Sequence, residues 1–420
     1  MVLERHGHEF NMDNARLLGE SIQMPFSKRI AQTRFLKAGL YEKWGQGGYG
    51  IIITGNVMLH PEELEAPGNA ILYAPHETPE SIEQFCRMAT AGKSGGNLMI
   101  MQISHPGHQV PAFINPNPLG ASDIKLKDQV MLVDRMDRIY AKPTPLDKAG
   151  ILEIVDQYSY TAEAAYFVGF DRVQLHGAHG YLIAQFLSRT TNNRTDEYGG
   201  TIRDRARIIG DIIRGIRSKV TDPSFVIGIK INSVEFQAKG FQVHFVELSG
   251  GTYEELGWNH GESAPRESTK KREAFFAMFA KDITPRLNRT VSYLTGGFRS
   301  ASGMADAIEL GISHGIGVAR PAGSDPVIPA EVIDGCISGA TYVKLPSEDI
   351  ITTILATGVQ MESMACGIPI INLSDPEEVL RFKDATQRHH KENGEKLLQG
   401  IIDPGYFVLG PLDKKIGCGL

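Results

Sequence analysis

Short runs of β-branched and other apolar residues recur along the chain and predict buried strands. Apolar residues at consecutive positions, without alternation, are typical of parallel strands that are covered on both faces. Seven runs stand out: GIIITG at 50–55, NLMIMQIS at 97–104, DRVQL at 171–175, FVIGIKI at 225–231, HFVELSG at 244–250, VSYLTGG at 291–297 and HGIGVAR at 314–320. QTRFLKA at 32–38 is a weaker, shorter candidate for a first strand.

Amphipathic helix patterns lie between most of these runs. They cover residues 80–93, 150–169, 201–220, 268–284 and, more briefly, 301–311. Alternation of strand and helix predicts an α/β architecture. Eight strands would close a (β/α)8 TIM barrel, and a doubly wound open sheet is the alternative.

The open sheet would be favoured by a G-x-G-x-x-G turn between a strand and a following helix. The match in GQGGYG, at Gly45, Gly47 and Gly50, follows the helix-like LYEKW and precedes a strand. That order is the reverse of the one that places pyrophosphate on a helix N-terminus. We interpret these glycines as a loop that ends a helix, which favours the barrel.

The regular alternation fails in two places. Only NSVEFQAKGFQV separates the strand ending near Ile231 from the one beginning near His244, whereas a parallel crossover needs at least ~10–12 residues, most of them helical. We therefore expect the helix between strands five and six to be missing. After about residue 345 the alternation stops, which predicts a barrel over 1–345 and a mostly helical extension over 346–420 packed on it.

Composition narrows the class of ligand. Hydrophobic residues make up 42% and charged residues 22%, and 43 basic against 49 acidic side chains give a net charge of −6. No basic face attracts nucleic acid, and no apolar run approaches the ~18 residues that span a membrane. We expect a small-molecule substrate and leave a homo-oligomer open. A cytoplasmic location fits four dispersed cysteines that form no zinc or iron–sulfur motif: Cys86, Cys336, Cys366 and Cys418.

The densest polar cluster follows the DRVQL strand and contains His176, His179 and Tyr181. In a barrel, residues just past a strand end face the catalytic mouth. Two imidazoles can hydrogen-bond a carbonyl or phenolate oxygen, while a phenol can deliver a proton to carbon. Each histidine taken singly could instead be a satisfied core group. H-x-x-H occurs here and at His105/His108, but without an adjacent glutamate base, so we expect no metal site.

LHGAHGYLIAQFLS, followed by NNRTDEYGG, resembles the signature of the Old Yellow Enzyme or NADH:flavin oxidoreductase family. The resemblance implies an FMN-binding barrel that takes hydride from NADH or NADPH and reduces activated C=C bonds. It makes His176 and His179 the donors to the substrate oxygen and Tyr181 the proton donor. Arg194, Asp196 and Tyr198 would order the loop behind them.

The resemblance extends from about Arg34 to the tail and also implies the FMN contacts. Gln102 would hydrogen-bond the flavin ring, and Lys230 would lie beside its N1/O2 edge, where a cation stabilises the reduced flavin. The phosphate site would contain Gly296, Gly297, Gly317 and Arg320. Ala319 stands where the family usually has glycine, which implies a tighter fit between the backbone and phosphate at this point.

The chain departs from the family pattern after RFLKA, which runs directly into GLYEKWGQGG. A small-residue stretch and a long loop normally stand between these segments. We therefore expect the barrel to be imperfect at its first strand as well as between strands five and six. The rival hypothesis is a degenerate, non-catalytic barrel that has lost FMN binding with these segments.

Overall fold

A computed structural model of the chain describes residues 40–126, 139–232, 243–249, 280–346, 349–399 and 405–412. It also describes the backbone of five short strands outside those ranges. These are β1 (Ile22–Gln23), β2 (Ile30–Ala31), β3 (Phe35–Ala38), β8 (Gln129–Met131) and β9 (Met136–Arg138).

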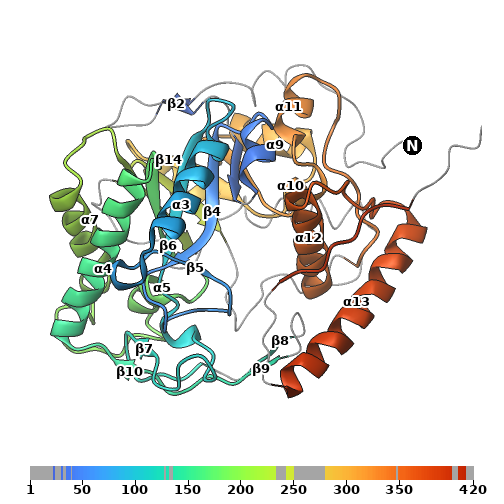
Figure 1. Ribbon diagram of the computed structural model, residues 1–420. Coiled ribbons are helices and arrows are strands. Elements are labelled where there is room, and N and C mark those ends of the chain that lie inside the picture. The colour runs from blue at the N-terminus through green and yellow to red at the C-terminus, as the bar shows by residue number, and fades with distance from the viewer. Residues whose placement is uncertain are drawn as a thin grey trace, which may run out of the picture.

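Eight parallel strands form a closed barrel (Figure 1). Each strand pairs with the next one along the chain, and β3 pairs with both β4 and β15, which closes the sheet. The (β/α)8 barrel is therefore confirmed. Its remaining strands are β4 (Ile51–Met58), β6 (Leu98–Ser104), β11 (Arg172–Gly177), β12 (Val226–Asn232), β13 (Phe245–Ser249), β14 (Val291–Thr295) and β15 (Gly315–Val318).

Helices between the strands cover the outside of the barrel. Four of them begin where the sequence supplies a side chain that caps the first turn: Thr78 for α3, Asp147 for α4, Thr201 for α6 and Ser300 for α9. The helices are α2 (Tyr41–Gly45), α3 (Pro79–Gly92), α4 (Lys148–Phe167), α5 (Leu182–Leu187), α6 (Ile202–Arg205), α7 (Arg207–Lys219), α9 (Ala301–Glu309), α10 (Pro321–Ser324) and α11 (Ile328–Ile333).

Two predicted helices need comment. The helix expected over 201–220 is divided at Ala206 into α6 and α7. Of the helix expected over 268–284, only residues from 280 onward are described, and 280–283 are helical. The start of that segment lies outside the described residues.

The first strand and helix are short, as expected. β3 has four residues, and α2, with five, begins three residues after β3 ends. Trp44 of α2 is nevertheless fully buried and donates a hydrogen bond of 3.0 Å to the carbonyl of Ala322, which ties the helix to α10. The GQGG segment ends this helix, and Gly48 has a φ of 80°.

The crossover from β12 to β13 is the second predicted irregularity. The two strands pair in parallel from Gly228 opposite Phe245 to Asn232 opposite Ser249. Residues 233–242 lie outside the described part of the chain. The missing helix at this point therefore stays a prediction.

Inward-facing side chains form an apolar layer and a polar layer. Alternate residues of a strand point to one face, so the register identifies the inward positions. Toward the amino ends of the strands they are mainly apolar, namely Ile51, Ile53, Leu98, Ile100, Val226, Phe245, Val291 and Tyr293, and the same register also turns the buried Arg172 inward. Toward the carboxyl ends they are Asn56, Gln102, Gln174, His176, Lys230 and Glu247. The interior is thus filled mainly by apolar side chains at the amino ends of the strands, and its polar side chains gather at the carboxyl ends.

The tail is helical and contacts the barrel. α12 (Ile350–Ala365) and α13 (Pro376–Leu398) lie along one flank (Figure 1). Leu355, Val359 and Phe382 belong to a small apolar cluster of this region, while Met364 belongs to the main core around the barrel. The tail therefore packs on the barrel, and its boundary at residue 345 stays a prediction.

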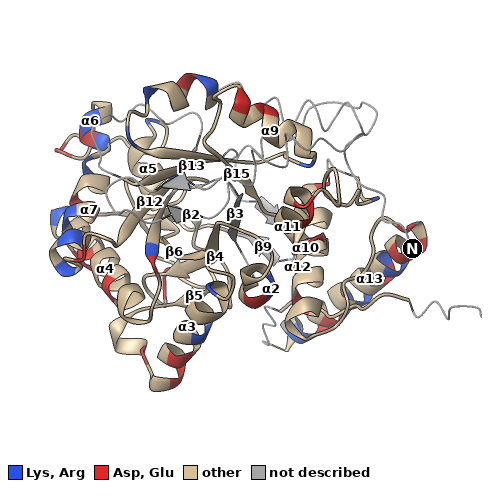
Figure 2. Cartoon of the chain, turned by 90° about the horizontal axis from the view of Figure 1, so that it is seen from above, with Lys and Arg blue, Asp and Glu red and all other residues tan. Residues whose placement is uncertain are grey.

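Charged side chains of both signs are interspersed on the outer helices. Figure 2 shows basic and acidic positions side by side on α3, α4, α7 and α13. This mixture agrees with the modest net charge of −6. None of the described helices is long and apolar enough to cross a membrane.

Candidate active site

The three residues predicted to carry the chemistry lie together at the end of β11. The ring of His176 is centred 5.0 Å from that of His179 and 4.6 Å from that of Tyr181. The rings of His179 and Tyr181 are 6.3 Å apart. His176 is the last inward residue of the strand, and the other two follow in the turn that leads into α5. The segment therefore presents two imidazoles and a phenol to one small region.

His179 adopts a left-handed backbone conformation that is uncommon for residues other than glycine. Its φ is 58°, and Gly180 follows with 80°. The turn is held on both sides, because the His179 amide donates to Asn232 Oδ1 (3.0 Å) and its carbonyl accepts from Gln109 Nε2 (2.8 Å). The ring Nε2 lies 3.2 Å from the hydroxyl of Ser249. Such over-determined strain is typical of a functional position.

Both imidazoles are neutral at neutral pH. Burial lowers the pKa of His179 to about 3, with a further contribution from the charge of Lys230. Burial also lowers the pKa of His176 far below its usual range, and both His179 and Lys230 add to the shift. His176 Nδ1 accepts from the amide of Ala178 at 3.3 Å, which leaves the proton on Nε2. His176 can therefore donate a hydrogen bond without carrying a charge.

Lys230 lies opposite His176 on the neighbouring strand and is paired with a buried carboxylate. Its Nζ is 3.2 Å from Glu247 Oε1, and the second oxygen of Glu247 accepts from Gln174 Nε2 at 2.9 Å. Glu247 is 4% exposed. An unpaired ammonium would be costly here, and the ion pair removes most of that cost. The sequence pattern identified Lys230 but not the acid that holds it.

Gln102 faces the same interior from β6. Its side-chain amide donates to Asn56 Oδ1 at 2.6 Å, and its backbone amide donates to the Thr54 hydroxyl at 2.9 Å. Asn56 donates in turn to Glu65 at 3.0 Å. These neighbours fix the orientation of the Gln102 amide and place an acidic side chain at the edge of the site.

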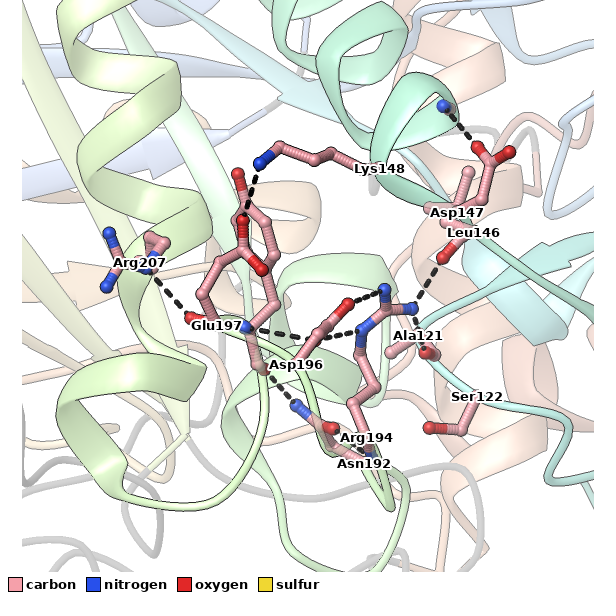
Figure 3. A network of polar contacts seen from close by, with 12 residues as sticks. Ala121, Ser122, Leu146, Asp147, Lys148, Asn192, Arg194, Asp196, Glu197 and Arg207 are labelled. Carbon is pink, nitrogen blue, oxygen red and sulfur yellow. Dashed lines mark hydrogen bonds and ion pairs between the residues drawn. The ribbon is translucent and has the colours of Figure 1, made fainter.

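A Pro-rich excursion, residues 105–147 between β6 and α4, is anchored to the segment that follows Tyr181. Arg194 forms a two-point ion pair with Asp196 and donates to the carbonyls of Ala121 (3.0 Å) and Leu146 (2.5 Å) (Figure 3). Asp196 Oδ1 also accepts from the amide of Tyr198 at 3.1 Å. The network clamps two distant points of the excursion beside the barrel mouth, which agrees with the ordering role implied for this motif.

A buried acid and a buried histidine face each other below this loop. Burial raises the pKa of Glu63 to about 8, against the lowering effect of hydrogen bonds from Leu119 and Asn115. Burial lowers the pKa of His105 to about 3, and the two side chains are 4.0 Å apart. Both groups are therefore neutral at pH 7. No cluster of three His, Cys, Asp or Glu side chains suited to a metal ion occurs in the described ranges.

Comparison with known proteins identifies the family. Residues 27–336 match the NADH:flavin oxidoreductase / NADH oxidase family. The chain belongs to this family.

Relatives agree over most of the sequence. The NADH-dependent flavin oxidoreductase nadA of Aspergillus parasiticus is 36% identical over 404 residues, covering 86% of this chain and 88% of that protein. 12-Oxophytodienoate reductase 1 of Oryza sativa is 32% identical over 171 residues, covering 41% of this chain and 43% of the rice protein.

Solved structures support the same fold at lower identity. Morphinone reductase superposes with a TM-score of 0.61 at 18% identity, covering 79% of this chain and 92% of that chain. An Old Yellow Enzyme homologue from Zymomonas mobilis gives a TM-score of 0.60 at 18% identity, over 79% of this chain and 98% of that chain.

The protein is an FMN-dependent oxidoreductase that uses NADH or NADPH.

The predicted phosphate end of the FMN site can be compared with the local structure around β14 and β15. Gly296 and Gly297, directly after β14, have φ values of 136° and 80°, which only glycine adopts readily. A Cβ at Gly317 would lie 1.8 Å from Thr295 Oγ1. That hydroxyl is buried and has no hydrogen-bond partner, as expected for a group that binds a ligand. Residues at this end therefore fit a phosphate group.

Arg320 and the two residues expected beside the flavin ring, Gln102 and Lys230, complete the predicted set of FMN contacts. Arg320 follows β15, and its guanidinium donates to the Thr353 hydroxyl of α12 at 2.8 Å. Gln102 and Lys230 lie in the polar layer of the interior, at the carboxyl ends of their strands. The residues present thus fit FMN between the strand-seven and strand-eight loops and the His176 region, and their individual contacts stay predictions.

Sequence reasoning missed the acidic residues of the site. Glu65 and Glu63 follow β4, and Glu247 lies within β13. Glu63 and Glu65 come after the carboxyl end of a predicted strand, which is the one signal that points to them, while Glu247 is a single acid within an apolar run. The signal is weak, because charged residues are also common in exposed loops.

Replacing Gly317 by alanine is expected to weaken FMN binding. The new Cβ would displace the Thr295 hydroxyl, an overpacking that typically costs about 1–3 kcal/mol. FMN affinity, measured by quenching of flavin fluorescence, should fall about tenfold or more. Gly394→Ala, where nothing lies within 4 Å of the new carbon, is the control and should bind FMN normally. Unchanged affinity of Gly317→Ala would show that this glycine does not shape the site.

Replacing Arg194 by lysine is expected to destabilise the protein by about 1–3 kcal/mol, because two carbonyls lose their donor. Urea unfolding measures the loss, and proteolysis should become faster within residues 121–147. Arg214→Lys alters an exposed ion pair with Asp211, so its effect should stay below about 1 kcal/mol. Equal losses in the two variants would contradict the clamping role.

Replacing Glu63 by glutamine is expected to stabilise the protein at pH 8 and not at pH 4.5. Between about 4.5 and 8 the unfolded chain releases the Glu63 proton while the folded chain retains it, so folding stability falls as pH rises. Glutamine removes this dependence and can keep the hydrogen bond from Asn115. Urea unfolding at both pH values should show a gain of several kcal/mol, up to about 4 kcal/mol, at pH 8 only. A gain of the same size at pH 4.5 would refute the assigned titration.

Proposed function

We propose that this oxidoreductase reduces a C=C bond conjugated to a carbonyl or similar electron-withdrawing group. The observation that carries the proposal is the cluster of His176, His179 and Tyr181 beside the ammonium of Lys230. The word reductase in the names of the rice relative and of morphinone reductase supports reduction of a second substrate.

The two histidines bind the substrate oxygen in this proposal. Neutral imidazoles donate hydrogen bonds to an oxygen that gains negative charge as the double bond is reduced. Because their pKa values lie far below 7, the histidines retain this role across the neutral range. Hydrogen bonds fix the turn at His179, so the imidazole of His179, the second donor, is already oriented before the reaction. No reorganisation energy is then needed during the reaction itself.

Tyr181 supplies the proton that the adjacent carbon requires. FMN, when bound, supplies the hydride chemistry that links the nicotinamide to this substrate. Lys230 places a positive charge in the polar layer of the barrel interior, beside the expected position of the flavin ring. Glu247 keeps that charge in position. We assign FMN binding to residues 1–345 and treat 346–420 as the packed extension. Small-molecule substrates enter at the mouth that the excursion after β6 borders.

The proposal is tested by the visible absorption spectrum of purified protein with FMN. A bound-flavin band should bleach on anaerobic addition of NADH or NADPH and recover on addition of a small cyclic enone such as 2-cyclohexen-1-one, with the saturated ketone as product. Bleaching without recovery by any enone or related activated alkene would refute the proposed substrate class. Folded protein that binds no FMN would favour the degenerate barrel.

Replacing Tyr181 by phenylalanine is expected to slow the recovery step by about 10²–10⁴-fold, because the proton donor is removed. Stopped-flow absorbance measures this step separately from bleaching by the nicotinamide. His179→Asn is the matched comparison, since asparagine tolerates the left-handed backbone and still donates a hydrogen bond. Recovery at the normal rate in Tyr181→Phe would show that another group delivers the proton.

A further inference from the structure

The imidazole of His179 has a hydrogen-bond partner that the chemistry described so far does not use. Its Nε2 lies 3.2 Å from the hydroxyl oxygen of Ser249, the last residue of β13. Ser249 is 7% exposed, whereas His179 is partly exposed. The Nε2 side of the ring is therefore turned toward a buried strand end, and any hydrogen bond from the ring to a substrate falls to Nδ1.

Ser249 belongs to the pair of opposed strand residues that also fixes the backbone of His179. It lies opposite Asn232 of β12, whose side chain accepts the hydrogen bond from the His179 amide. This pair is one step nearer the mouth than the pair of Lys230 with Glu247. Opposed residues of neighbouring strands point to the same face of the sheet. The Asn232 amide and the Ser249 hydroxyl therefore set the turn and the ring of His179 from one side.

The single proton of the neutral ring decides what Ser249 must do. Burial lowers the pKa of His179 to about 3, so at neutral pH the ring has one N–H donor and one acceptor nitrogen. If Nε2 carried the proton, Ser249 would accept it and Nδ1 would present a lone pair to the substrate oxygen. If Ser249 donates to Nε2, the proton lies on Nδ1. Only the second arrangement makes His179 a donor to the substrate.

His176 is fixed through the opposite nitrogen of its ring. Its Nδ1 accepts from the amide of Ala178, which leaves the proton on Nε2. The two rings are centred 5.0 Å apart, and both can donate toward one oxygen only if each anchoring group donates to its ring. An amide can only donate, whereas a hydroxyl donates or accepts. The direction of the Ser249 hydrogen bond therefore decides whether the site has one donor imidazole or two.

We propose that Ser249 is a positioning residue that selects the tautomer of His179. Its hydroxyl donates to Nε2, which holds the ring proton on Nδ1 and directs it to the substrate oxygen. No covalent bond changes in this role, because Ser249 acts on the substrate only through the ring. The inference rests on the proposed function, since it takes His179 as a donor to the substrate oxygen.

Nitrogen NMR of the full chain tests the tautomer without cofactor or turnover. In protein labelled with ¹⁵N-histidine, protonated and unprotonated ring nitrogens have well-separated frequencies, and the resonances lost in His179→Asn belong to residue 179. Nδ1 should carry the proton in the wild type and in Ser249→Thr, which keeps the hydroxyl. In Ser249→Ala the population should shift toward the form protonated on Nε2. A wild type with its proton on Nε2, or an unchanged tautomer in Ser249→Ala, would overturn the inference.

Stopped-flow absorbance measures the consequence for the reaction. Recovery of the reduced, FMN-loaded protein by 2-cyclohexen-1-one should slow about tenfold or more in Ser249→Ala. The limiting rate should fall more than the affinity for the enone, because the oxygen gains its negative charge in the transition state. Ser249→Thr should keep most of the wild-type rate. The matched control is Ser292→Ala, near the amino end of β14, which alters a second Ser–His pair, with His314 at 2.8 Å, and should recover like the wild type.

A double-mutant cycle separates tautomer selection from a general structural effect. An asparagine amide nitrogen always carries its protons, so His179→Asn leaves no tautomer for Ser249 to select. Ser249→Ala should therefore slow recovery in the wild type and have little effect in His179→Asn. Equal losses in both backgrounds would refute the inference and leave the proposed function intact. If His179→Gly, which tolerates the left-handed backbone, recovers at the wild-type rate, the donor role of His179 in the proposed function itself fails.

Discussion

Closure of the parallel sheet is the constraint on which the site depends. A sheet that stopped short of closure would expose the edges of β4 and β15 and the apolar layer between them. The four residues of β3 prevent this by pairing with both strands through the backbone. Closure also fixes the stagger of the strands, and the stagger brings the carboxyl ends of β4, β6, β11 and β12 to one mouth.

The polar layer at that mouth is arranged around one buried charge. Lys230 lies between His176 on one neighbouring strand and Glu247 on the other. Its charge helps keep both histidines neutral, and Glu247 compensates it so that it can be buried. The site therefore holds a cation and two uncharged donors within one layer, which suits a reaction in which negative charge develops on both a cofactor and a substrate.

Much of this arrangement is predictable from the sequence. The apolar runs located all eight strands, because a closed parallel barrel buries both faces of each strand and leaves a strong signal. The segment from His176 to Tyr181 was also predictable, since catalytic residues of barrels follow strand ends.

Other parts required the fold. Glu65 and Glu247 reach the site through register and through a loop, and nothing in their local sequence distinguishes them from solvated acids. The left-handed turn at His179 depends on Asn232 and Gln109, which lie far away in the chain. The break at Ala206 divides a segment whose apolar periodicity runs on without interruption, so the pattern could not locate it.

The clamp made by Arg194 has a consequence for how this protein can diverge. Its two contacts with the excursion are to backbone carbonyls, at Ala121 and Leu146, and a carbonyl is present whatever side chain stands there. The excursion can therefore change its side chains between these two points without losing its attachment. Side-chain variation between these two points and attachment of the segment to the barrel are in this way independent of each other.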